Sequence, residues 1–327
     1  MKDTIKKLVE AWGPSGYEHE VRALIREEVE GLADEIRVDP LGNLICRIGS
    51  GGTKIMIAAH MDEIGLMVTH VDDDGYLRFA PIGGLMPKAL FANRVRFENG
   101  TLGTISADGT EWAKAPSLDD CYIDVSTGAD TDAGVGVGDP AAFWREMEVR
   151  GNRAIAKSMD DRIGCVVGIE AMRKLKKTKH EVYFVFTVQE EVGLRGARPA
   201  AFGLEPDFGI SLDVTGTGDT PKGHKMDVAL GKGAAIKVRD GGHIVPPFIK
   251  NLMVKRAEEA KIPYQLEVLP GGTTDAAGIQ LSRAGIPSGC ISIPTRYLHT
   301  VSETVDLNDV SACVKLLVAV LSKPFEA

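Results

Sequence analysis

The stretch VYFVFTVQEEVGLRGA, residues 182–197, indicates the fold class because it joins a predicted buried strand to two adjacent acids. Its first residues are β-branched or aromatic, which is typical of a strand, and Gly193 and Gly196 follow the run. Glu190 and Glu191 therefore stand at the carboxyl end of this strand. In an open α/β sheet, ligands bind in the crevice beyond such strand ends. The stretch thus predicts an α/β fold with a functional site at one edge of its sheet.

The remaining chain alternates strands and helices on both sides of a segment with a different pattern. From about residue 66 to 155, short alternating runs are separated by Gly, Asn and Asp turns, without a long helical period. The predicted helices cover 2–12, 18–31, 162–177, 245–261, 274–284 and 306–322, and the predicted strands 35–39, 43–48, 54–60, 182–188, 208–213, 265–269 and 289–293. We therefore predict an α/β catalytic domain with a central mixed sheet, formed by 1–65 and 156–327 and interrupted by a small all-β domain at 66–155.

The composition is that of an ordinary globular protein. Of the 327 residues, 44% are hydrophobic, which is ample for a core, and the formal net charge is −8 without a basic tract, so we expect no nucleic-acid partner. No apolar run approaches the roughly 20 residues that cross a bilayer, and the first residues lack the apolar centre of a signal peptide. The 5 cysteines are scattered without CxxC spacing, which predicts reduced thiols. We expect a cytoplasmic protein that binds no membrane.

Histidines and acids follow several predicted strands. They are His60 and Asp62 after 55–59, Glu190 and Glu191 after 182–188, Asp213 after 208–212, His299 beyond 289–293, and Asp160 and Asp161 just before a helix. Imidazole and carboxylate ligands without thiolate suit zinc, cobalt or manganese. If one carboxylate bridges, five such side chains can hold two ions that share and polarise an attacking water.

This interpretation also explains the two adjacent glutamates. One can bind metal while the other accepts a proton from the water. Each motif alone has a structural explanation, because an isolated HxD or Asp-Asp is more often a loop or a helix cap. Their combination at successive strand ends favours a metal site.

The motifs resemble those of the glutamyl and deblocking aminopeptidases, some of which carry the label endoglucanase. The resemblance rests on AAHMDEIG, SMDDRIG, TVQEEVGLRGA, SLDVT, GGTTDAAGIQLSRAGIPSGCISIPTRYLHT and VDLNDV, and it extends over the whole chain. It implies a phosphorylase/hydrolase-like catalytic domain with a central mixed sheet and a barrel-like dimerisation domain. It also implies peptide substrates, two divalent metal ions, and dimers that assemble into a dodecameric tetrahedral particle.

Roles for individual residues follow from the same resemblance. It implies that His60, Asp160 and Asp213 bind one ion, that Asp160, Glu191 and His299 bind the other, and that Asp160 bridges. Glu190 resembles the general base, Asp62 the acid that orients His60, and Asp161 the second residue of a strained Asp-Asp peptide. The motifs HTVSE and SMDD depart from commoner versions without removing a ligand, which leaves substrate preference open.

Other interpretations stay open at this point. A glycoside hydrolase needs two carboxyl groups flanking a sugar and gives His60 and His299 no role. A non-catalytic scaffold would not need the complete ligand set. His224 and His243 are candidates for facing substrate, and Thr274 either helps to bind a substrate oxygen or caps a helix. We expect His70 and the acids at 72–74 to form a solvated turn.

Overall fold

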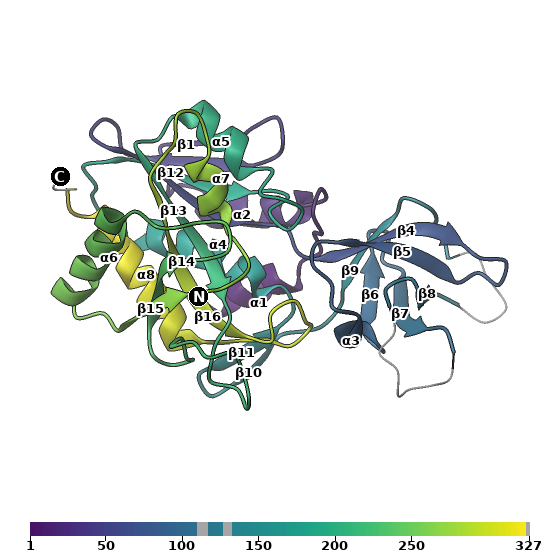
Figure 1. The fold of residues 1–327 in the computed structure, drawn as a ribbon. Helices are drawn as coiled ribbons and strands as arrows, with labels where there is room; N and C mark the ends of the chain where they lie inside the picture. Colours follow the sequence, from purple (N-terminus) through teal and green to yellow (C-terminus); the bar gives the residue numbers. More distant parts are fainter. Residues whose placement is uncertain (110–116, 127–132, 325–327) are drawn as a thin grey trace.

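The computed structural model describes residues 1–109, 117–126 and 133–324. Figure 1 shows a larger part, in which helices surround a sheet, and a smaller part formed by β4 to β9 that projects from one side. The larger part carries both chain termini, so the smaller part is an excursion of the chain between β3 and β10.

An eleven-stranded mixed sheet runs through the larger part in the order β1-β2-β12-β3-β13-β16-β17-β11-β10, and β14 and β15 join it through β16. Its strands are β1 (Glu35–Val38), β2 (Leu44–Ile48), β3 (Lys54–His60), β10 (Glu148–Arg150), β11 (Arg153–Ala156), β12 (Glu181–Thr187), β13 (Phe208–Thr215), β14 (Ala234–Arg239), β15 (Tyr264–Val268), β16 (Ser288–Arg296) and β17 (Glu303–Asp306). The four central strands β12, β3, β13 and β16 are parallel, so their carboxyl ends meet at one edge of the sheet.

Helices cover both faces of this sheet. They are α1 (Lys2–Glu10), α2 (His19–Val29), α4 (Met159–Lys174), α5 (Ala197–Leu204), α6 (Pro247–Glu259), α7 (Asp275–Gln280) and α8 (Leu307–Leu321). Strand β3 sends Ile55 and Ile57 into the core beneath α4, and Met56 and Ala58 into a second core beneath α5 and α7. A strand buried on both faces must be apolar at successive positions, which explains its sequence.

The smaller part is a closed six-stranded barrel in the order β4-β5-β8-β7-β6-β9. Its elements are β4 (Gly65–Val71), β5 (Leu77–Ile82), α3 (Pro87–Leu90), β6 (Arg94–Phe97), β7 (Leu102–Ala107), β8 (Cys121–Asp124) and β9 (Pro140–Phe143). The barrel has its own apolar core, built from residues such as Leu66, Val95 and Ile123. The predicted fold class is confirmed. The division at residues 66 and 155 stays a prediction, and β10 and β11 pair with the large sheet.

Three elements of the larger part did not follow from the sequence pattern. Helix α5 contains Pro199 and Gly203, β14 contains the buried Lys237, and β17 has only four residues, two of them acidic. Gly203, Lys237 and the acids of β17 each weaken the local pattern of their element, and tertiary packing outweighs weak local propensity.

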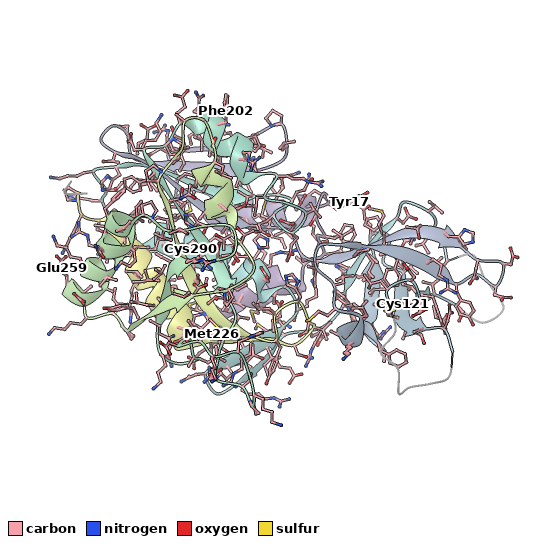
Figure 2. All side chains as sticks on the ribbon, in the orientation of Figure 1. Tyr17, Cys121, Phe202, Met226, Glu259 and Cys290 are labelled. Carbon is pink, nitrogen blue, oxygen red and sulfur yellow. The ribbon has the colours of Figure 1, made fainter. Side chains whose placement is uncertain are left out.

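All five cysteines are free and buried, and Figure 2 shows Cys121 in the barrel and Cys290 in the larger part. Within the described ranges, none of the helices combines the length and the apolar character that crossing a membrane requires.

Candidate metal centre

The candidate site lies at the edge where the parallel strands end. His60 is the last residue of β3 and pairs in register with Thr187, the last residue of β12, so the turn carrying Glu190 and Glu191 follows directly beside it. Asp213 lies near the end of the neighbouring strand β13. Asp62 follows β3, and the remaining residues come from the first turn of α4 and from the loop after β16. The fold therefore brings all the predicted site residues to one edge.

Asp160 lies between the two histidines. Its Oδ1 is 2.9 Å from Nε2 of His60, and its Oδ2 is 3.4 Å from Nε2 of His299. The ring of His299 is also 3.5 Å from Oε2 of Glu191, and the ring of His60 is 3.9 Å from Oε2 of Glu190. Each oxygen of Asp160 thus faces a different histidine, which is the geometry that a bridging carboxylate requires.

Asp213 approaches the same histidine from another side. Possible ligand atoms of His60, Asp161 and Asp213 lie within 4.8 Å of one another, as do those of His60, Asp160 and Glu191. The oxygens of Asp161 accept the backbone N–H groups of His60 at 3.2 Å and of Gly164 at 3.1 Å. Asp161 therefore holds the backbones of β3 and α4 together, whereas Asp213 accepts the backbone N–H of its own neighbour Val214 at 2.7 Å.

The pKa values of the clustered acids indicate whether a metal ion fits the site. Burial and the neighbouring carboxylates raise the pKa of Glu190, Asp161 and Asp213 well above their ordinary values. Burial and the charge of Asp160 raise the pKa of Glu191 to about 8. Bound divalent cations would keep such crowded acids ionised. The donor set, carboxylates and imidazoles without a thiolate, therefore fits zinc, cobalt or manganese.

The histidines shift in the opposite direction. Although burial alone would lower the pKa of His60, the contacts with Asp160 and Asp62 raise it well above its ordinary value. Burial alone would also lower the pKa of His299, but the negative charges of Asp160 and Glu191 outweigh this effect and raise the pKa to about 10. Both rings thus lie in a strongly negative environment that attracts cations.

Asp62 connects one histidine to both glutamates. It is fully buried, and its carboxylate accepts the backbone N–H groups of Glu190 at 3.0 Å and Glu191 at 3.2 Å and the hydroxyl of Ser15 at 2.6 Å. Nδ1 of His60 is 3.4 Å from its Oδ1 and 3.1 Å from its backbone oxygen. Asp62 therefore sets the position of His60 and of the Glu190–Glu191 turn together, as an orienting acid does.

Two partners of His299 were missed by the sequence analysis. Nδ1 of His299 donates a hydrogen bond to the backbone oxygen of Gly84 at 2.6 Å, in the barrel loop between β5 and α3. This bond leaves Nε2 as the free nitrogen that faces Asp160 and Glu191. Glu303 accepts the backbone N–H groups of both Asp160 and His299. A backbone oxygen has no signature in the sequence, and Glu303 is recognisable only once β17 is placed beside β11 and β16.

Of the remaining candidates, Thr274 and Asp72 have structural explanations, and the roles of His224 and His243 stay predictions. Thr274 caps α7 by accepting the backbone N–H of Ala276, and its hydroxyl lies 3.0 Å from that of Ser211. His224 is exposed, whereas His243 is buried near Asp240 and Lys237. In the hairpin after β4, Asp72 accepts the backbone N–H groups of Asp74 and Tyr76, as a turn requires.

A mixed α/β sheet with histidines and acids gathered at the carboxyl ends of its parallel strands is an arrangement found among metal-dependent hydrolases. The model of the M42 glutamyl aminopeptidase family matches residues 42–316, and the chain belongs to this family. The chain is accordingly an aminopeptidase, a hydrolase of peptides. The resemblance stated from the sequence motifs is confirmed.

Individual relatives match over nearly the full length. The chain is 47% identical over 321 residues to a putative aminopeptidase of Acetivibrio thermocellus, covering 97% of each chain. It is similar to the structure of an aminopeptidase of the archaeon Desulfurococcus kamchatkensis, with a TM-score of 0.93 and 42% identity over 98% of this chain and 94% of that one. It is also similar to the TET1 peptidase of Pyrococcus horikoshii, which can assemble into a tetrahedron or a large octahedral shell; the TM-score is 0.88, with 33% identity over 98% of this chain and 99% of that one.

Proposed function

We propose that this chain removes N-terminal residues from peptides with two divalent metal ions held at the end of its central sheet. One ion would bind to His60, Asp160 and Asp213, and the other to Asp160, Glu191 and His299. The observation that carries the proposal is the position of Asp160, whose two oxygens face the two histidines at 2.9 and 3.4 Å. When bound, the ions would polarise the scissile carbonyl and lower the pKa of the attacking water.

Glu190 supplies the general base. Its neighbour Glu191 faces His299, whereas the Glu190 carboxylate lies 3.9 Å from the ring of His60, beyond hydrogen-bond distance. A carboxylate that lies beside the ligands without being one of them can accept the proton of the water. It then passes that proton to the leaving amine, so the base is regenerated at the end of each cycle.

Asp62 and Gly84 hold the ligands that do this chemistry. Asp62 contacts His60 and accepts backbone N–H groups of the Glu190–Glu191 turn. The backbone oxygen of Gly84 accepts the hydrogen of Nδ1 of His299, which leaves Nε2 free. Such outer partners commonly change metal affinity or activity 10- to 100-fold when removed. The chain therefore orients its proposed ligands through both its catalytic part and its barrel.

We further propose that the chain forms homodimers through the barrel, which assemble into a twelve-subunit tetrahedral particle. Support comes from the Pyrococcus horikoshii relative and its tetrahedral or octahedral assemblies. Enclosure of the sites would admit short peptides and exclude folded proteins. Light scattering that shows a fully active monomer at micromolar concentration would contradict this assembly.

Removal and restoration of metal tests the proposed chemistry. We expect a chelator to abolish hydrolysis of aminoacyl-p-nitroanilides, and zinc, cobalt or manganese to restore it, with two ions bound per chain. His60→Ala and His299→Ala should each weaken a different ion. Full activity in a preparation shown to be metal-free, or one tightly bound ion that neither substitution affects, would overturn the proposal.

A further inference from the structure

We infer that Glu303 is a positioning residue that holds two of the proposed metal ligands in place, an inference that rests on the proposed function. Glu303 is the first residue of β17 and is 2% exposed. Its Oε2 accepts the backbone N–H of Asp160 at 3.0 Å, and its Oε1 accepts the backbone N–H of His299 at 2.8 Å. A single carboxylate thus joins the proposed bridging acid to one of the two histidines that the acid faces.

The sheet places Glu303 between the two segments that it connects. Strand β17 pairs with β11 on one side, where Glu303 is opposite Ala156, and with β16 on the other. The chain leaving β11 leads to Asp160, and the chain leaving β16 leads to His299. Both proposed ligands are therefore carried on segments that leave the sheet beside Glu303, and the carboxylate fixes their separation.

Both ligand backbones need an acceptor that regular structure does not provide. Asp160 lies in the first turn of α4 with φ −74° and ψ 107°, outside the helical region, so its N–H has no place in the helical hydrogen-bond pattern. His299 has φ 57°, in the left-handed region that residues other than glycine rarely adopt. Surrounding contacts must hold such a conformation. Glu303 provides the contact at the backbone, and Gly84 provides the one at the ring.

A second buried carboxylate makes the same type of contact away from the proposed ligands. Asp309 is 1% exposed and accepts the backbone N–H groups of Gly231 at 2.6 Å and Gly233 at 2.7 Å, one with each oxygen. The segment that it holds carries none of the proposed ligands. Asp309→Asn therefore reproduces the loss of a carboxylate acceptor, and its effect on stability, without touching the metal site.

The test compares Glu303→Gln with Asp309→Asn in the full-length chain. A glutamine keeps the size of Glu303, but its amide NH₂ would face one of the two N–H donors, so one ligand backbone loses its acceptor. We expect both variants to unfold at a lower temperature than the parent in chelator. Only Glu303→Gln should bind the ion at His299 more weakly, with an affinity about 10- to 100-fold lower than that of the parent. This affinity is measured for zinc by competition with a chromophoric chelator. Glu303→Gln should also gain less in melting temperature when zinc is added.

The rise in melting temperature with zinc separates positioning from general stability. Glu303→Asp, which keeps the charge but is too short to span both donors, serves as a second variant if the first fails to fold, and we expect it to weaken the same ion. Parent-like zinc affinity in a folded Glu303 variant, or an equal loss in Asp309→Asn, would overturn the inference while leaving the proposed function intact. A parent chain that binds none of zinc, cobalt and manganese would overturn both.

Discussion

The contact between the barrel and the proposed metal site leads to a prediction for Gly84→Ala. A methyl group at position 84 would lie 3.1 Å from Nδ1 and 3.2 Å from Cε1 of His299. Ordinary van der Waals contacts to a Cβ begin at about 3.4 Å, so the imidazole must move by a few tenths of an ångström. The same residue supplies the oxygen that accepts the hydrogen of Nδ1 at 2.6 Å, so this movement also distorts the hydrogen bond that orients the ring.

The expected loss follows from this displacement. Partners that orient a metal-binding histidine commonly change metal affinity or activity by 10- to 100-fold when they are altered. We therefore expect Gly84→Ala to weaken the ion at His299 about 10-fold and to lower kcat by a similar factor. Position 84 does not have a left-handed φ, so alanine adds no backbone strain there, and the barrel should keep its fold.

Gly136→Ala is the matched control for this experiment. Gly136 lies in the same barrel, also lacks a positive φ, and an added methyl group there would contact nothing within 4 Å. Zinc competition and steady-state kinetics on both variants separate the effect on His299 from any general effect on the barrel. If Gly84→Ala binds both ions with parent affinity and keeps full kcat, the orienting role of the Gly84 oxygen is wrong.

Two further predictions concern other buried carboxylates. Asp62→Asn removes one of the carboxylate oxygens that accept the backbone N–H groups of Glu190 and Glu191 and the hydroxyl of Ser15. We therefore expect kcat of the folded variant to fall about 10-fold or more in steady-state assays. Parent-like kinetics would refute this prediction. Burial raises the pKa of Asp309 to about 6 from 3.8, so the folded state binds its proton more tightly. The contribution of this group to the free energy of unfolding should therefore fall as pH rises from about 4 to 6. Urea titrations at several pH values in this range give the free energy of unfolding of the parent and of Asp309→Asn. The change of this free energy with pH should differ between the two proteins, and an identical pH dependence would contradict the raised pKa of Asp309.

The fold was predictable where one local pattern dominates a segment. The apolar run of β3 and the β-branched and aromatic run of β12 are required by burial on both faces of a parallel sheet, and that requirement is visible residue by residue. Helix α5 and strand β14 were not predictable in this way. Pro199 lies in the first turn of α5, where proline is tolerated, but Gly203 weakens the helical pattern. Lys237 can be buried in β14 because its ammonium group lies 2.5 Å from Glu267, on β15, and 3.6 Å from Asp240.

The candidate site shows the same distinction. His60 ends β3, Asp213 lies near the end of β13, and the Glu190–Glu191 pair follows β12, so the strand-end rule brings them together from sequence alone. The contacts of Gly84 and Glu303 depend on how two distant parts of the chain meet. Gly84 acts through a backbone oxygen, which any residue type possesses, and Glu303 acts because β17 pairs with β11 and β16. The side-chain chemistry was therefore predictable, whereas the contacts of Gly84 and Glu303 that support it were not.

The most direct test of the central claim compares the amides of the two adjacent glutamates. Glu190→Gln keeps the shape of the base but cannot accept a proton, so we predict that it retains two ions while kcat falls at least ~10²-fold. Glu191→Gln replaces an anionic ligand with a neutral one, so we predict loss of one ion and partial recovery of activity in excess metal. Metal content and kcat measured on both variants decide the matter. Loss of metal from Glu190→Gln with retention by Glu191→Gln would reverse the two roles, and two fully metallated, fully active variants would contradict the mechanism.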